Sequence, residues 1–390
     1  MRWPQPITRL ALTGAIVLGS AAVSPAPVRA CGWDYETYHA EARSMPCVFD
    51  ALMGYWPKHT DAYHERRLEA FALGLAWMPD WTEALDAQGI SLLKLGRLPE
   101  AEVVMKHRLR VAPDAYASHA NLGTLFTFTG AYDDALRHID RAMAIEPAAH
   151  FGREQYHRDL VDYLRRGKAD PKVFTTETFV GIAPTPNQRA QGSKALWTRL
   201  GVKDDAVDAL VAMLTVYGAD ELAEVYFALG ELLATRGNRR LAYTAYRRAK
   251  ELGHPRKATA KRAMADIDAA LRKSFYKGTG SDGYRRGFGP VHRQDIYRGI
   301  GRKYPHERGE AKKLQREYAA WETGQLAKGL PVWTQAGLDK IYAHMHDVRR
   351  RCKAPRIIDD PLAPPAGQDP SAGLPEAGIG VAPAAKEEGQ

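Results

Sequence analysis

The residues best suited to chemistry in this 390-residue chain are cations interleaved with aromatic rings. Residues 236–356 contain 30 Lys and Arg against 11 Asp and Glu. Such cations neutralise the charges of a polyanion while neighbouring rings stack on its sugars or bases. If the protein is exported, we expect an anionic envelope polymer or an acidic protein face rather than nucleic acid. The candidate ligands are Arg285, Arg286, Arg293, Arg298, Arg302 and Lys303. The alternative is that helices 307–327 and 335–351 have ordinary solvated basic faces.

Motifs for catalysis or metal binding are missing from the sequence. It contains no HExxH, CxxCH or GxSxG pattern. His344 and His346 are two residues apart and lie on different faces of a helix, whereas His150 and His157 share a face but lack a third ligand at metal-site spacing. We therefore predict no catalytic residue, no metal, no cofactor and a non-enzymatic role. A hydrolase with an unrecognised site remains the third alternative.

The N-terminal residues predict export. Residues 1–30 have a basic start, a short apolar run and a small-residue cleavage pattern, as in a secretory signal peptide. The mature protein is expected in the periplasm or outside the cell, where Cys31 and Cys47 could form a disulfide and Cys352 would be the odd cysteine. Two alternatives stay open: these cysteines are unpaired, or Cys31 is lipidated and anchors the chain to the outer membrane.

A repeat of 34 residues organises the elements that must position any site. Four residues of the segment 116–147 recur 34 positions earlier, in the segment 82–113. The pairs are Gly89 with Gly123, Gly96 with Gly130, Ala101 with Ala135, and Pro113 with Pro147. This period is typical of stacked helix–turn–helix units. Gly123 would leave room for two helices to cross, Gly130 would form the turn, and Pro147 would end the second helix.

These positions resemble the tetratricopeptide repeat (TPR) superfamily. A third copy, at 221–255, has matching small and large residues, and 63–79 resembles the second helix of a degenerate copy. The resemblance implies an all-α solenoid and a concave groove, lined by the first helix of each repeat, that binds a protein or peptide partner. The groove residues it implies include Glu83, Asp86, Ile90, Asn121, Thr124, Thr127, Phe227 and Glu231.

Composition divides the chain into six segments. Helical repeats are expected at 31–167 and 201–274, separated by a linker or irregular loop at 168–200. A basic helical region follows at 275–356, and the tail at 357–390, rich in Pro, Ala and Gly, is expected to be disordered. With the signal peptide at 1–30, this organisation predicts an all-α repeat solenoid with additional C-terminal helices.

Overall fold

The protein is an all-α helical solenoid. The computed structural model describes residues 46–147, 149, 154–190, 192–216, 218–276, 293–331 and 335–348. Within these ranges the chain forms sixteen helices and no strand. The signal peptide expected at 1–30 and the tail expected at 357–390 lie outside the described residues.

Each of the three predicted repeat copies folds as a pair of packed helices. The first pair is α4 (Thr82–Lys94) with α5 (Leu98–Val111). The second pair, α6 (Tyr116–Thr129) with α7 (Tyr132–Ile145), begins 34 residues later at both of its helices. The third is α14 (Ala223–Arg236) with α15 (Arg239–Glu251). The helix pairs read from the sequence are therefore confirmed.

Glycines take the two structural roles that the repeat predicts. Gly130 follows α6 with φ of +73°, a left-handed conformation that ends a helix at little cost in glycine. Gly123 lies where α6 crosses α7, and a Cβ atom there would be 2.7 Å from Cγ1 of Ile139. The turn and the close crossing both require glycine, so these residues belong to the scaffold.

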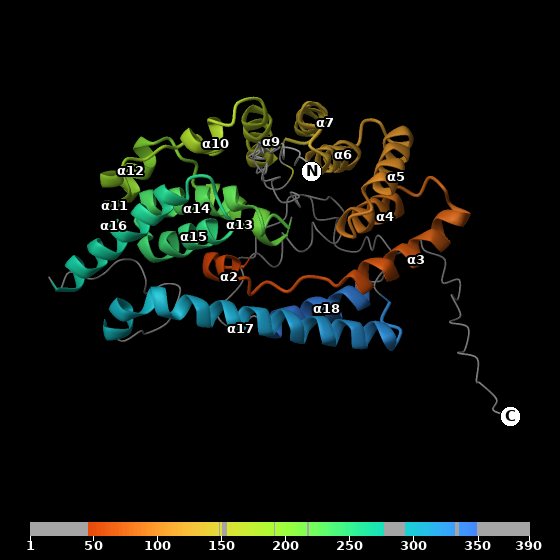
Figure 1. Ribbon diagram of the computed structural model, residues 1–390. Helices are drawn as coiled ribbons and strands as arrows, with labels where there is room; N and C mark the ends of the chain where they lie inside the picture. The colour runs from red at the N-terminus through yellow and green to blue at the C-terminus, as the bar shows by residue number, and fades with distance from the viewer. Residues whose placement is uncertain are drawn as a thin grey trace, which may run out of the picture.

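Single helices flank the pairs. α3 (Asp61–Trp77) precedes α4 and matches the predicted lone second helix, while α9 (Glu154–Ala169) follows α7. α13 (Ala206–Thr215) leads into α14, and α16 (Lys257–Tyr276) packs against α15. In Figure 1 the elements from α3 to α16 follow one another along an arch.

The segment expected to be a linker is packed into the second half of the solenoid. It contains three short helices: α10 (Val173–Thr176), α11 (Pro186–Ala190) and α12 (Lys194–Arg199). Both α11 and α12 contact α14, and the ring of Trp197 is 2% exposed. Prolines and polar residues suggest an exposed loop, but dispersed apolar residues such as Ile182 and Trp197 pack the segment against helices.

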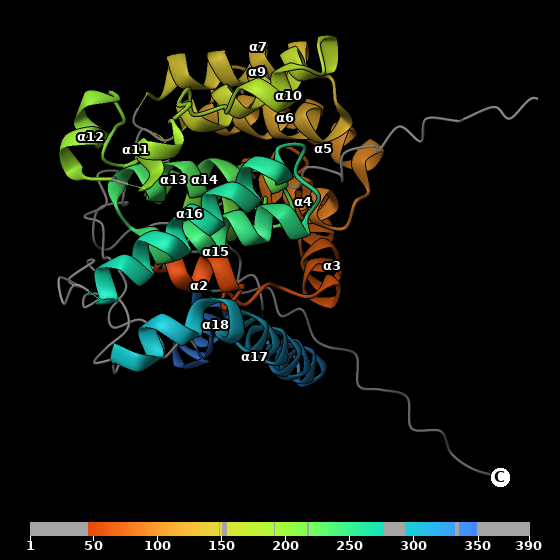
Figure 2. The same cartoon turned by 60° about the vertical axis from the view of Figure 1, so that its left-hand side comes forward.

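The C-terminal helices run across the open side of the arch. α17 (Arg293–Ala327) is followed by α18 (Gln335–Val348), and α17 contacts both α3 and α15, which are far apart along the solenoid. The short helix α2 (Val48–Met53) lies between α17 and the pair α14–α15, as Figures 1 and 2 show from two directions. α17 thus connects the two ends of the repeat array.

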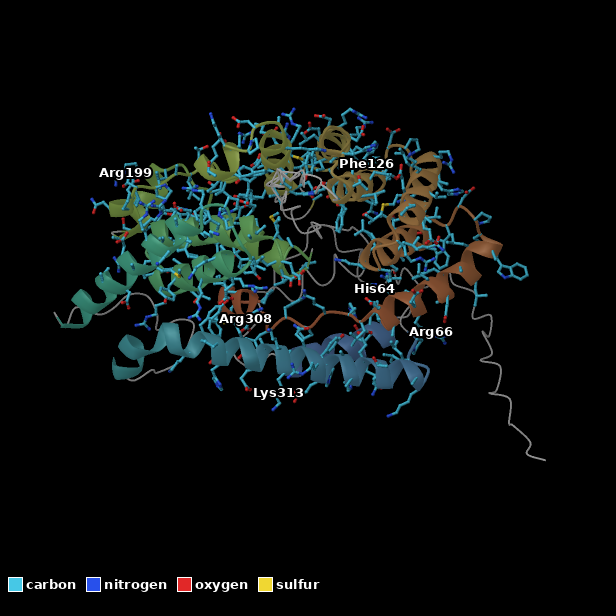
Figure 3. The ribbon with its side chains drawn as sticks, in the orientation of Figure 1. His64, Arg66, Phe126, Arg199, Arg308 and Lys313 are labelled. Carbon is cyan, nitrogen blue, oxygen red and sulfur yellow. The ribbon has the colours of Figure 1, made fainter. Side chains whose placement is uncertain are left out.

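The segment between α2 and α3 is hydrogen-bonded to α17 over its whole length. Arg308, labelled in Figure 3, donates from Nη1 to the carbonyl oxygen of Met53 at 2.6 Å. Nε2 of Gln315 donates to the carbonyl oxygen of Gly54 at 3.0 Å, and Oε1 of Gln315 accepts from the backbone N–H of Lys58 at 3.2 Å. We call this contact between residues 53–60 and α17 the clasp.

A buried carboxylate ends the clasp. Glu322 is fully buried and accepts from the backbone N–H and the hydroxyl of Thr60, at 2.7 and 2.8 Å, and from the Tyr318 hydroxyl at 2.8 Å. Nδ1 of His59 lies 2.6 Å from Oε1 of Glu322. Burial alone would raise the pKa of Glu322, but the charge of His59 and the hydrogen bonds lower it on balance. The site is thus built to hold a charged carboxylate.

Candidate functional site

We call the helices α3 to α9 the first repeat block and α13 to α16 the second repeat block. In the first repeat block, two residues expected to line the groove, Asp86 and Asn121, belong to a buried polar network. Arg108 on α5 donates from Nε to Oδ2 of Asp86 at 3.0 Å, and Asn121 donates from Nδ2 to Oδ1 at 3.1 Å. Arg108 also donates from Nη1 to the hydroxyl of Ser118 at 3.1 Å. The Asp86 carboxylate therefore ties α4 to α5 and α6, and its oxygens already accept hydrogen bonds from inside the chain.

Three further groove candidates are core residues. Ile90, Thr124 and Thr127 are each at most 2% exposed. The Thr127 hydroxyl donates to the carbonyl oxygen of Gly123, one turn earlier, at 2.8 Å. These side chains fill the space between helices, so their role in this structure is to stabilise the helix packing.

The second repeat block buries its groove candidates in a different way. Arg189, from α11, forms a two-pronged ion pair with Glu231 on α14, with N–O distances of 2.8 and 3.0 Å. The Phe227 ring stacks on His254 with centroids 4.1 Å apart. Both Phe227 and Glu231 are at most 1% exposed. The chain itself thus supplies the groups that contact these two side chains.

Glu83 is the one groove candidate with an exposed side chain. It lies in the first turn of α4, close in sequence to the end of α3. There, Leu73, Trp77 and Met78 expose 53%, 88% and 41% of their surface, although all three are large and apolar. We call these three residues the α3 patch. Sequence reasoning missed it, and the available signal was a Leu and a Trp spaced by one helical turn on the face of α3 away from α4.

The α3 patch continues a face that already packs against helices. Along this face Tyr63, Arg66, Ala70, Leu73 and Trp77 follow one another by three or four residues. Tyr63 is fully buried in a cluster with Tyr318 of α17 and Ile341 of α18. Arg66 marks the face on the lower side of α3 in Figure 3, opposite His64. The face is therefore covered by helices at its start and exposed at its end.

Carboxylates are numerous around the α3 patch. Glu65 and Glu69 on α3 are 53% and 66% exposed at their side chains, and Asp80 just after the helix is 73% exposed. Arg66 pairs with Glu69, and Arg97 lies 3.5 Å from Glu65. With Glu83, the surroundings of the patch are acidic.

The polyanion candidates remain a prediction. Arg285 and Arg286 lie outside the described residues, as do the side chains of Arg293, Arg298 and Arg302, while Lys303 is exposed on α17. Several other cations of this basic region are used inside the protein. Arg308 is part of the clasp, and Arg247 donates to the carbonyl oxygen of Gly301 and lies 4.3 Å from the Tyr304 ring centroid.

Cys47 forms a disulfide. The chain has three cysteines, and the other two, Cys31 and Cys352, lie outside the described residues. The predicted pairing of Cys31 with Cys47 therefore stays a prediction.

The described residues contain neither a membrane-spanning helix nor a cluster of three or more metal-ligating side chains. None of their helices is long and apolar enough to cross a membrane. No group of three or more His, Cys, Asp or Glu in the described ranges could hold a metal ion. Comparison with known proteins adds no assignment, because no family model matches the chain and no curated protein is significantly similar to it.

Proposed function

We propose that this chain is a non-catalytic, exported TPR scaffold that binds an amphipathic helix of a protein partner on the α3 patch. The exposure of Trp77, 88% of its surface, carries the proposal. A large aromatic side chain exposed on a face that is otherwise packed against helices is typical of an interaction site. The predicted groove is less well supported, because all its candidates except Glu83 are buried.

The repeat architecture supports a helix as the occupant. In a TPR array each second helix packs between two first helices, and α3 is a second helix with no first helix before it in the described residues. Among the described residues, α17 and α18 cover the start of its face, around Tyr63. A partner helix lying along Leu73 and Trp77 would complete this packing and bury apolar surface that water now contacts.

Charge defines the partner further. Four carboxylates with exposed side chains, Glu65, Glu69, Asp80 and Glu83, lie on α3 or within six residues of its end. Although Arg66, Arg97 and His107 pair with three of them, a partner helix with Lys or Arg beside its apolar face is favoured. Export is supported by the signal-like residues 1–30 and by the disulfide at Cys47, since disulfides persist in oxidising compartments.

Photo-crosslinking from the patch tests the proposal. A photoreactive amino acid replaces Trp77 in the full chain, expressed in the cell that exports it, and the crosslinked peptide is sequenced. We expect one protein, crosslinked through a basic amphipathic helix, with a yield that falls as salt rises. The matched control carries the same group at Val103 of α5, an apolar residue 69% exposed, and should give no such product.

Three outcomes would contradict the proposal. They are crosslinks to lipid, crosslinks only to a second copy of this chain, or equal products from positions 77 and 103. A double variant, Leu73→Ser with Trp77→Ser, should reduce the affinity for the partner at least tenfold. Because both side chains are exposed, the double variant should still fold. Val103→Ser should leave binding within twofold of the wild type.

A further inference from the structure

Two histidines from adjacent helices of the second repeat face one another. His119 lies in the first half of α6 and His138 in the middle of α7. Their Nδ1 atoms are 3.0 Å apart, and the rings are tilted by 36° with centroids 5.2 Å apart. Both residues are half-buried, so the pair is accessible from solvent. The pair is separate from the α3 patch.

A backbone carbonyl determines which nitrogen of His119 carries hydrogen. Nε2 of His119 lies 2.9 Å from the carbonyl oxygen of Pro113, which can only accept. Nε2 must therefore be the N–H donor, and in the neutral ring Nδ1 is the acceptor of a hydrogen bond from the Nδ1–H of His138. Histidines that bind metals usually donate their other ring N–H in the same way, which holds the ring in place.

His138 lies in a half-buried position beside an aromatic ring. Burial is the largest effect and lowers the pKa of His138 to about 4; the charges of His119 and Arg137 act in the same direction, and Asp134 opposes them. The Phe126 ring covers one side, with its centroid 5.5 Å from that of His138.

We propose that His119 and His138 bind one divalent copper ion through their two Nδ1 atoms. With metal–nitrogen bonds of about 2.0 Å, a separation of 3.0 Å corresponds to an angle of roughly 95° at the metal. That angle is close to the cis arrangement of a tetragonal ion, and Cu²⁺ is the divalent ion that imidazole sites bind most tightly. His138 would move its ring proton from Nδ1 to Nε2. Water would complete the coordination, since no described third ligand joins the pair.

Titration of the full mature chain with Cu²⁺ alone tests the site. His119→Gln and His138→Gln should each lower the affinity for the first equivalent of Cu²⁺ at least tenfold, because a single imidazole cannot chelate the ion. The matched control is His107→Gln on α5, whose ring pairs with Asp80 on the surface, and it should bind within twofold of the wild type. Electron paramagnetic resonance of the first equivalent should show two coordinated nitrogens in the wild type and fewer in the two site variants.

A second measurement does not depend on how the variants fold. Anomalous scattering from wild-type crystals soaked in copper should give a peak about 2 Å from both Nδ1 atoms. A peak only at other histidines would overturn the proposal. So would equal copper affinity in the wild type and in both site variants, which would mean an adventitious ion only.

Discussion

The two repeat blocks have different residues at one equivalent position. The residue after the helix-crossing glycine is Ile90 in the first copy, Thr124 in the second and Glu231 in the third. All three side chains are at most 2% exposed. An apolar side chain and a hydroxyl can be buried within a helix pair, whereas a buried carboxylate requires a cation.

The cation comes from outside the α14–α15 pair. Arg189 belongs to α11, lies 42 residues before Glu231 in the chain, and forms both hydrogen bonds with it. In the first block the charged residue Asp86 is instead paired with Arg108 of the same helix pair. The repeat therefore determines where a side chain lies but leaves its chemistry to the local partners.

The largest expected effect is at Arg189. Arg189→Met leaves the Glu231 carboxylate buried without its cation, and we expect the free energy of unfolding to fall by about 3–5 kcal/mol. Urea unfolding of the full chain measures this change. The double variant Arg189→Met with Glu231→Leu should recover most of the loss, because it removes both charges. Thr124→Val, at the equivalent position, should cost about 1 kcal/mol. Equal costs for the Arg189 and Thr124 variants would contradict the comparison.

Substitution of the glycines at the helix crossings should destabilise the two blocks by different amounts. A Cβ atom at Gly230 would be 2.8 Å from the buried ring of Tyr246, which cannot move aside easily. At Gly89 it would be 3.0 Å from Cγ of Met105, a flexible side chain. We therefore expect Gly230→Ala to destabilise the protein by about 2–3 kcal/mol and Gly89→Ala by about 1 kcal/mol or less, measured by thermal and urea unfolding.

Two further glycines test whether the cost of a Gly→Ala change follows the space available for the added Cβ atom. Gly123→Ala should cost about as much as Gly230→Ala, because its Cβ would lie 2.7 Å from Cγ1 of Ile139 and 3.3 Å from the backbone nitrogen of Ile139. Gly324 in α17 has no atom within 4 Å of an added Cβ, so Gly324→Ala should stabilise the helix by about 0.5–1 kcal/mol. If all four Gly→Ala changes altered the free energy of unfolding equally, helix propensity, and not steric contact at the helix crossings, would determine the effect of these substitutions.

The contribution of Glu322, on the helix that spans both blocks, depends on pH. Its folded pKa lies below the ordinary value of 4.5. The charged carboxylate therefore stabilises the fold above pH 4.5, and this contribution is lost as pH falls through the lowered folded pKa. We expect Glu322→Gln to cost about 2 kcal/mol near pH 7 and less as the solution is acidified.

The control for this variant is an exposed carboxylate on the same helix. Glu317 is 64% exposed and lies 3.8 Å from Lys313, so Glu317→Gln should change stability by less than about 0.5 kcal/mol at either pH. If the difference in free energy of unfolding between the wild type and Glu322→Gln stayed constant with pH, the charge of the carboxylate would not contribute to stability.

Local features of this fold could be predicted from the sequence, and its long-range contacts could not. The spacing of Gly89, Gly123 and their partners predicts the helix pairs, because each glycine acts on a helix close by in the chain. The packing of Trp197 and the pairing of Arg189 depend on helices that follow tens of residues later. The α3 patch was missed for a related reason: whether Leu73 and Trp77 are covered depends on where α17 and α18 end.

The clasp also has a consequence for the order of folding. Its hydrogen bonds join residues 252 to 263 positions apart, such as Tyr55 with Glu307 and Thr60 with Glu322. Helix pairs such as α4–α5 need only neighbouring residues and can form while the chain emerges during synthesis. Residues 53–60 have to wait for α17, nearly the last element to appear. Until α17 is in place, the two ends of the array are joined only through the helices between them. We expect the clasp, once formed, to make the two ends unfold together.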